Sequence, residues 1–341
     1  NVEGMLVTFP YTLVVSEYFQ LARFGQLVLT LNEREHQFTD ANEPDADGYA
    51  AFLADLSTRR IILDDDNNDN NSALGSPDEP YYWPREGLSI TNLIRGGDTI
   101  NNLTGVLHWS WAGGSNTNAW RVRPVLEAVD YDFTPVIPRP DTPSEVGGSL
   151  KVASFNVLNY FKTIDLGPDI CGPAADLDCR GAHSESELTR QRNKIVAAML
   201  AMDADVLGLM ELENDADASI AHLVECLNAV TGPGTYDYIA TGFIGEDAIK
   251  VGLIYKTATV DPVGSYAILD STVDPTFNDD KNRPALAQTF DEIATGGRFT
   301  SVVNHLKSKG SSCNDVGDPN LNDGQANCPQ TRTDAANALV N

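Results

Sequence analysis

The chain has 341 residues, which is enough for two domains with separate hydrophobic cores. It carries 49 acidic and 23 basic residues, and its formal net charge is −26. A protein that holds nucleic acid by bulk electrostatics needs clustered lysines and arginines, so this charge argues against that class of binder. Two interpretations stay open: the acidity serves solubility alone, or it suits a salty, cation-rich medium that screens charge.

The five cysteines predict two local disulfides. None of them forms a Cys-x-x-Cys pair, so a zinc ribbon or a thioredoxin-like redox site is not expected. Cys171 and Cys179 enclose one short loop, and Cys313 and Cys328 enclose another. This arrangement favours disulfides and an oxidising, extracellular or cell-surface compartment. Cys226 lies in an apolar helical pattern and is predicted to be a buried free thiol.

No run of about 18 apolar residues is present, so no membrane span is predicted. The chain opens as a strand without an initiator methionine and stops within a helical pattern. We therefore expect a fragment or a processed chain, from which targeting signals could have been lost.

Residues 1–134 show short strand patterns separated by turns, with few helices. Strands are expected at residues 5–9, 12–16, 26–30, 60–63, 104–108 and 119–123. This pattern predicts a small β-rich domain, and we expect a five-stranded barrel of the oligonucleotide-binding (OB) type. Trp109, Trp111 and Trp120, together with residues 81–83, either stack on bases or fill the core.

Two acidic segments in this half, residues 45–48 and 64–71, carry the oxygen ligands that Ca²⁺ favours. Neither fits the complete calcium-binding loop of a helix–loop–helix site, because the later glutamate is out of place. Both are expected to be loops. A solvated acidic loop is the favoured interpretation, and a structural Ca²⁺ site is the alternative.

Residues 135–148 contain four prolines and little apolar content, so we expect a semi-stiff linker between two domains. The second domain, residues 149–341, alternates strand and helix patterns. Strands are expected at residues 151–157, 205–211, 250–255, 283–290 and 298–305, and helices at residues 186–202, 218–230 and 331–340.

Polar side chains end several of these strands. Asn156 ends the first strand and Glu211 the second, and apolar strands that end in this way place chemistry at the rim of an α/β sheet. A buried carboxylate without a partner is costly, and Mg²⁺ would remove this cost because it binds one or two carboxylates and keeps several waters. Glu211 is preferred over Glu213 because it comes first after the apolar run. The sequence predicts a site for Mg²⁺, or Mn²⁺, at Glu211 and Asn156.

His305 ends the last of these strands and is followed by Lys307. A histidine at a strand end beside a lysine is a candidate for acid–base work on an anion. Arg283 begins the neighbouring strand and could bind a phosphate oxygen. A structural, hydrogen-bonded histidine is the alternative, and the company of Asn156, Glu211 and Arg283 makes it the less favoured one.

Taken in order, these segments resemble the successive motifs of the endonuclease/exonuclease/phosphatase family, which includes pancreatic deoxyribonuclease and the abasic-site endonucleases. The motifs lie at residues 151–156, 205–211, 250–256, 283–290 and 302–305. The β-rich first half and the linker resemble those of secreted bacterial nucleases of the ExeM/NucH type. The resemblance implies an α/β (α+β) four-layer sandwich, in which two β-sheets are flanked by helices.

Carried over residue by residue, the resemblance implies that Asn156 and Glu211 position the divalent metal. Arg283 would contact phosphate, and His305 would act in proton transfer or phosphate stabilisation. Asn304, next to the histidine, is predicted as a further substrate contact together with the lysine at 307.

The sequence departs from the family at two points. The nuclease members often pair a carboxylate with the histidine, and Asp247, the nearest candidate, matches that pattern poorly. The family's Gly-Asp-x-Asn motif and its terminal Asp-His motif, which normally activates the attacking water, are absent. The chain is therefore expected to hold about half an active site, which a longer chain or a second chain would complete.

The resemblance implies a secreted, divalent-metal-dependent nuclease that hydrolyses extracellular DNA, with RNA as a further substrate. Two alternatives are kept. One is another phosphodiesterase or phosphatase of the same fold, resembling the sphingomyelinases or the inositol phosphatases. The other is a non-enzymatic calcium-binding surface module that uses the acidic segment at residues 64–71.

Overall fold

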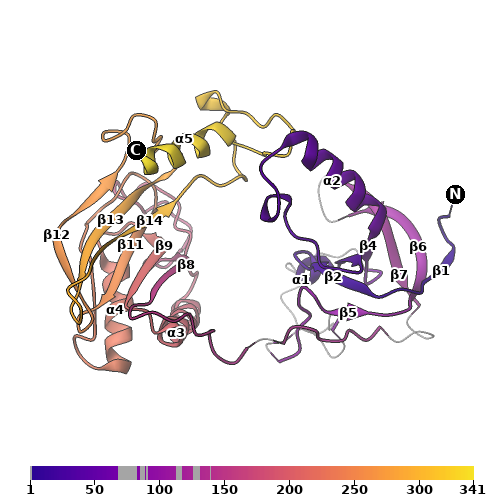
Figure 1. Cartoon of the computed structure of the whole chain (residues 1–341), viewed down its shortest axis with the longest axis horizontal. Helices are drawn as coiled ribbons and strands as arrows, with labels where there is room; N and C mark the ends of the chain where they lie inside the picture. The colour runs from indigo at the N-terminus through magenta and orange to yellow at the C-terminus, as the bar shows by residue number, and fades with distance from the viewer. Residues whose placement is uncertain are drawn as a thin grey trace. The chain divides into compact units, whose positions relative to one another are not determined.

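The computed structural model describes residues 2–67, 83–84, 89, 91–112, 117–125, 131–138 and 140–341. The chain divides into two compact units, Asn1–Pro140 and Asp141–Asn341, and the division lies inside the predicted linker (Figure 1). No helix of the described residues is both long and apolar enough to span a membrane.

The first unit is built on one sheet, with seven strands in the described part of the chain in the order β1-β6-β7-β4-β3-β2-β5. The strands are β1 (Leu6–Phe9), β2 (Leu13–Glu17), β3 (Leu27–Leu31), β4 (Arg60–Leu63), β5 (Thr99–Ile100), β6 (Leu103–Trp111) and β7 (Asn118–Pro124). Neighbours are antiparallel except β4 and β7. The six predicted strands are present, but the sheet has seven strands rather than five, and an OB-type barrel stays a prediction.

One of the two acidic segments is a helix start, and its prediction as a loop was wrong. Helix α2 (Ala46–Arg59) begins there, and the Asp45 side chain accepts hydrogen bonds from the backbone N–H groups of Asp47 and Gly48. An aspartate at this position satisfies donors that the first helical turn leaves free. In the other segment, the Asp64 carboxylate is fully buried and pairs with the Arg121 guanidinium at 2.5 Å. Residues 68–71 lie outside the described residues.

The tryptophans of this unit divide between core and surface. Trp83 is buried, donates a hydrogen bond from Nε1 to the Gly25 carbonyl, and belongs to the core cluster of the sheet. Trp111 packs edge-on against Phe24. Trp109 is 46% exposed and packs against Trp120 with ring centroids 5.3 Å apart. Tyr81 and Tyr82 lie outside the described residues, and base stacking stays a prediction.

The second unit contains two packed β-sheets, in the orders β10-β11-β9-β8 and β12-β13-β14. The strands are β8 (Val152–Tyr160), β9 (Val206–Glu213), β10 (Tyr236–Tyr238), β11 (Ile249–Lys256), β12 (Val260–Leu269), β13 (Arg283–Glu292) and β14 (Arg298–His305). β8 and β9 are parallel, and the other neighbours are antiparallel. A buried apolar cluster that includes Val206, Leu253, Leu286 and Val303 joins the two sheets. Strands β10 and β12 were not predicted.

Two helices cover the outer face of the four-stranded sheet (Figure 1). They are α3 (Glu185–Met202) and α4 (Ala218–Thr231). Ser184 caps α3 by accepting a hydrogen bond from the Glu187 backbone N–H, and the buried Ile195 and Met199, four residues apart, face the sheet. The two helices, the four-stranded sheet and the three-stranded sheet form three layers. The fourth layer of the expected sandwich stays a prediction.

The two predicted disulfides, Cys171–Cys179 and Cys313–Cys328, are both formed. Cys226 is free, as expected, but it is only half-buried, because it lies at the edge of the core under α4. Helix α5 (Pro329–Val340) packs its small side chains Ala335 and Ala338 against Phe277.

Candidate functional site

The site is built where the parallel strands β8 and β9 run side by side. The prediction that Asn156 and Glu211 end these strands was wrong, because β8 continues to Tyr160 and β9 to Glu213. Asn156 lies opposite Met210 in the pairing of these strands. Its side-chain Nδ2 donates a hydrogen bond of 2.9 Å to Glu211 Oε1, and its Oδ1 accepts one of 2.8 Å from the Leu158 backbone N–H. The Asn156 amide therefore binds the Glu211 carboxylate through Nδ2 and the backbone of the following residues through Oδ1. The structure brings together the two residues predicted as the metal site.

Glu211 owes its direction to a β-bulge in β9. One residue of β11, Val251, faces two residues of β9, Met210 and Glu211. Leu209 and Leu212 both lie in the core under the helices, so the extra residue turns Glu211 out of that core. The φ angle of Glu211 is +64°, in the left-handed region that disfavours side chains. Backbone strain of this kind is common at functional sites.

The loop after β8 reaches the same carboxylate through its backbone. The Asn159 N–H donates a hydrogen bond of 3.1 Å to Glu211 Oε2. Leu158 and Asn159 both have positive φ angles, of 55° and 49°. From α3, Gln191 Nε2 donates to the Leu158 carbonyl at 2.7 Å. A helix side chain therefore holds the turn that presents a donor to Glu211, a role that the sequence pattern did not reveal.

The second sheet supplies an imidazole and a guanidinium. Arg283 and His305 lie directly opposite each other in the pairing of β13 with β14. His305 Nε2 is 3.7 Å from Glu211 Oε1, and the two side chains are 24% and 19% exposed. Arg283 Nε and His305 Nδ1 are buried and have no hydrogen-bond partner among the described residues. Buried polar groups without partners are rare in folded proteins and need an explanation, such as a ligand.

Asp247 completes the group, together with an arginine that was not predicted. The Asp247 carboxylate contacts Arg283 Nη2 through Oδ2, and Arg180 Nη2 lies 2.9 Å from Oδ1. The sequence had suggested Asp247 as a partner of His305, but its contacts are with the two arginines. Arg180 directly follows Cys179, and its place beside a disulfide loop was the only signal in the sequence.

The electrostatics of the site favour a neutral histidine beside a cation. Burial and the neighbouring Arg283 lower the pKa of His305, while Glu211 and Asp247 act in the opposite direction. Burial also lowers the pKa of Arg283, against the influence of Asp247. Arginine starts from so high a pKa that it stays charged at neutral pH.

Two of the predicted substrate contacts, Lys307 and Asn304, make no hydrogen bond or ion pair with these side chains among the described residues. The Lys307 ammonium is buried and donates hydrogen bonds to the carbonyls of Ser308 and Ser311 and to the Ser311 hydroxyl. Its charge therefore holds its own loop. Asn304 is exposed, and strand alternation turns it to the face opposite His305. We therefore build the site without them.

The donor set fits a water-rich Mg²⁺ or Mn²⁺ site rather than a cage of protein ligands. Among the residues that the structure describes, no group of three or more His, Cys, Asp and Glu side chains is arranged to hold a metal. Mg²⁺ needs only one or two carboxylates because it keeps several waters. The Glu211 carboxylate, fixed by Asn156 and by the Asn159 N–H, fits this mode.

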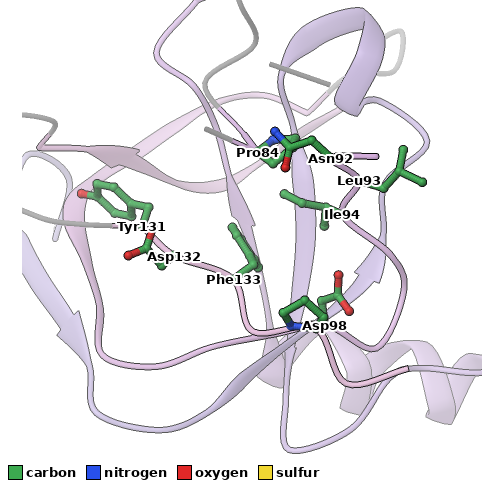
Figure 2. Close-up of a pocket in the computed structure, with 9 residues that line it drawn as sticks. Pro84, Asn92, Leu93, Ile94, Asp98, Tyr131, Asp132 and Phe133 are labelled. Carbon is green, nitrogen blue, oxygen red and sulfur yellow. The ribbon is translucent and has the colours of Figure 1, made fainter. Parts of the chain in front are cut away.

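The first unit contains a pocket of about 210 Å³ (Figure 2). Ile94, Tyr131 and Phe133 are among the residues that line it. The Asp98 carboxylate is already engaged, because it accepts hydrogen bonds from the backbone N–H groups of Arg95 and Val136. The sheet rim of the second unit groups more chemistry and is taken as the functional site.

No protein-family model matches the chain, and no curated protein matches it at a significant level. Among solved structures, the catalytic domain of human Nocturnin with bound sulfate matches at 18% identity and a TM-score of 0.30, over 47% of this chain and 50% of the other. An endonuclease/exonuclease/phosphatase from Bacteroides vulgatus matches at 17% identity and a TM-score of 0.29, over 46% of this chain and 52% of the other. The 2',3'-cyclic phosphatase ANGEL2 matches at 18% identity and a TM-score of 0.29, over 46% and 40%. The chain spans about half the length of these structures or less, and similarity at this level defines neither its fold nor its activity.

Proposed function

We propose that the chain is part of a divalent-metal-dependent hydrolase of phosphodiester bonds, and that the sheet rim of the unit Asp141–Asn341 is its phosphate site. One observation carries this proposal. A carboxylate, an imidazole and a guanidinium from three strands come together. Glu211 Oε1 lies 3.7 Å from His305 Nε2, and Arg283 lies opposite His305 in the pairing of β13 with β14. Arg283 Nε and His305 Nδ1 are buried without a hydrogen-bond partner among the described residues. This combination suits an anion that is held by hydrogen bonds near a metal.

Arg283 is assigned to bind the phosphate. Its Nη2 is held by Asp247, while its Nε is buried and has no partner in the described part of the chain, so a substrate oxygen that reached this N–H would meet an unsatisfied donor. Guanidinium groups suit phosphate because their donors match the geometry of its oxygens. Burial strengthens such a contact because less water competes for the donor.

His305 is assigned to a phosphate oxygen that gains negative charge during the reaction. In hydrolysis, the oxygen of a water bonds to phosphorus, the bond from phosphorus to the leaving oxygen breaks, and the leaving oxygen takes a proton. A neutral imidazole N–H fixed at the rim can stabilise the charge that develops on the phosphate.

Glu211 would hold the metal, and Asn156 would orient its carboxylate. When bound, Mg²⁺ or Mn²⁺ would supply charge neutralisation at the phosphate and lower the pKa of a coordinated water. The Asn159 N–H fixes the second carboxylate oxygen, so the carboxylate is presented in one orientation. A structural Ca²⁺ elsewhere remains a separate possibility from this site.

DNA is the proposed substrate, and RNA is the second one to test. Both offer the phosphodiester monoanion that Arg283 and His305 would bind. The two disulfides suit an oxidising compartment, which supports the proposal of a secreted enzyme that acts on extracellular nucleic acid. Site contacts rather than overall charge would have to hold the substrate, because the chain carries a net charge of −26.

The test is cleavage of plasmid DNA by the protein in its full natural length, with Mg²⁺ or Mn²⁺ and with or without EDTA. We expect EDTA to abolish cleavage, and Glu211→Gln and His305→Ala each to lower kcat/KM about 100-fold or more. His36→Ala is the matched control, because His36 is 76% exposed in the first unit. It should stay within about twofold of the native rate.

Other outcomes separate the alternatives. Intact plasmid together with hydrolysis of bis(p-nitrophenyl) phosphate would indicate a phosphodiesterase with another natural substrate. Failure to hydrolyse either compound with any divalent ion would refute the proposed function. Stabilisation by Ca²⁺ that survives Glu211→Gln would then favour a calcium-binding module.

A further inference from the structure

Arg180 has no place in the proposed reaction, yet it contacts the residue that holds Arg283. Its Nη2 lies 2.9 Å from Asp247 Oδ1, while Arg283 Nη2 contacts Oδ2 of the same carboxylate. Arg180 is 36% exposed and Arg283 is 18% exposed. One carboxylate therefore separates an outer arginine from an inner one, and each guanidinium forms an ion pair with one of its oxygens. The contact at Oδ1 lacks hydrogen-bond geometry, so this buried oxygen has no hydrogen-bond partner among the described residues.

The backbone on both sides of Arg180 is fixed. Cys179 before it is buried and bonded to Cys171. Gly181 after it lies so close to Phe161 that an added Cβ would stand 2.4 Å from the Phe161 Cβ. The disulfide packs in one cluster with Phe161, close to where the chain passes Asp247. The loop therefore delivers the Arg180 side chain from a rigid support.

Asp247 is held as firmly from its own backbone. Its carbonyl accepts a hydrogen bond of 3.0 Å from Asn214 Nδ2, and the next residue, Ala248, is fully buried in the cluster of the disulfide. The Ala248 carbonyl accepts a hydrogen bond from the Asn214 N–H. The carboxylate thus has little freedom to follow either arginine.

The sharing of oxygens decides which donors of Arg283 remain free. An arginine beside a carboxylate favours a two-point contact in which two N–H groups meet the two oxygens. The Arg180 guanidinium stands 2.9 Å from Oδ1, and Arg283 contacts Asp247 only through Oδ2, so that neither Oδ1 nor Arg283 Nε has a hydrogen-bond partner within the described ranges. Without Arg180, Oδ1 would be open, and Arg283 could close on Asp247 with Nε as the second donor.

The charges agree with this division of contacts. Two guanidiniums and one carboxylate leave one positive charge in excess, which matches the single negative charge of a phosphodiester group. In a chain with a net charge of −26, two arginines at one carboxylate concentrate positive charge locally, as Arg121 and Arg123 also do at Asp64 in the first unit.

We propose that Arg180 is a positioning residue that keeps Arg283 available to phosphate by occupying the second oxygen of Asp247, and that the Cys171–Cys179 disulfide holds Arg180 in place. This inference rests on the proposed function of Arg283 as the phosphate ligand. It makes phosphate binding at the site depend on an intact disulfide loop.

Steady-state kinetics on plasmid DNA give the first test. Arg180→Gln should raise KM about tenfold and change kcat less than about threefold, because it removes a contact that organises binding. Arg180→Lys keeps a cation at Oδ1 and should recover most of the loss. Arg190→Gln is the matched control, since Arg190 is 66% exposed on α3 and should have no effect. An unchanged KM in Arg180→Gln would overturn the proposal.

A double-mutant cycle tests whether Arg180 acts through Asp247. Once Asp247→Asn has removed the charged two-point acceptor, Arg180→Gln should add less than about twofold. If it costs the same factor in both backgrounds, Arg180 contacts the substrate directly and the positioning role is wrong. The role of the disulfide is tested by a second cycle. In the variant that carries both Cys171→Ser and Cys179→Ser, Arg180→Gln should cause no further change in KM. If that variant does not fold, the Asp247 cycle still decides the question.

An experiment without turnover separates this inference from the proposed function. Inorganic phosphate is titrated into the protein without metal, while the NMR signal of the Arg283 Nε–H group is followed. We expect phosphate to shift this signal in the native protein and to leave it unmoved in Arg180→Gln. No shift in the native protein would refute Arg283 as the phosphate ligand, and with it the proposed function. Equal shifts in both proteins would refute the role of Arg180 alone.

Discussion

The left-handed backbone at Glu211 predicts that a glycine variant is more stable than an alanine variant at this position, which reverses the usual order of stability. Glu211 has a φ of +64° at the bulge of β9. Replacing it with alanine or with glycine removes the same carboxylate and the same hydrogen bonds from Asn156 and Asn159. The difference in stability between the two variants therefore reports only on the backbone.

The magnitude follows from two opposing effects. The left-handed conformation costs a residue with a Cβ about 1–2 kcal/mol, and glycine is free of this cost. Glycine in turn loses about 0.5–1 kcal/mol relative to alanine, because its unfolded chain is more flexible. We therefore expect Glu211→Gly to be more stable than Glu211→Ala by about 0.5–1 kcal/mol. Ser301 on β14, whose φ is not positive, is the control site, and there the alanine variant should be the more stable one.

The assay has to observe the second unit. All four tryptophans lie in the first unit, at positions 83, 109, 111 and 120, so tryptophan fluorescence would follow the wrong half of the chain. Hydrogen exchange of the amides in β9 along a urea series reports on the correct unit, whereas far-ultraviolet circular dichroism sums over both units. If Glu211→Gly is no more stable than Glu211→Ala while Ser301 shows the ordinary order, the left-handed turn stores no strain and our account of the bulge is wrong.

Two further predictions concern a hydrogen bond and a carboxyl group. Gln191→Ala removes the donor to the Leu158 carbonyl, so it should lower kcat/KM several-fold and speed hydrogen exchange in the turn, while Gln330→Ala on α5 serves as the control. Burial raises the pKa of Asp65 in the folded protein to about 6. The protonated carboxyl therefore stabilises the fold at pH values below the pKa of Asp65 in the unfolded chain, and this stabilisation is lost as the pH rises through about 6. Asp65→Asn should therefore be more stable than the native protein by about 1 kcal/mol at pH 8, after allowance for solvent screening, and the gain should shrink toward pH 4. Thermal melts from pH 4 to pH 8 measure this difference, and a gain that does not depend on pH would contradict it.

Much of the second unit follows from local patterns. The strand expected at residues 298–305 coincides with β14, and the helix expected at residues 186–202 differs from α3 by one residue at its start. These elements alternate or repeat their apolar residues with the period of their secondary structure. Asn156 and Glu211 lie close together because β8 and β9 are parallel neighbours in one sheet. His305 reaches Glu211 from the other sheet, which the expectation of a single sheet rim did not foresee.

Other features depend on contacts that no local pattern records. Asp45 was expected in a solvated acidic loop, with a Ca²⁺ site as the alternative. Aspartate is equally suited to start a helix, and only the fold distinguishes these roles. Lys307 looked like a phosphate ligand, but three oxygens of its own loop hold its ammonium. Arg180 lies 67 positions from Asp247 in the sequence numbering, and the disulfide loop that joins them spatially gives no periodic signal. The direction of Glu211 depends on a bulge, which breaks the alternation that strand prediction assumes.

Under the proposed function, the arginine pair around Asp247 has a consequence for how the rate of DNA cleavage responds to salt. A positively charged nuclease meets DNA faster at low ionic strength, because attraction guides the encounter. This chain is repelled at long range, since its net charge is −26, and it attracts a phosphate only within the short reach of Arg180 and Arg283. Salt at about 0.1 M limits electrostatic forces to about 10 Å, which removes the repulsion before it weakens the partly buried contacts. The association rate should therefore rise with ionic strength, pass through a maximum and then fall, so a dilute buffer would understate the activity of this protein.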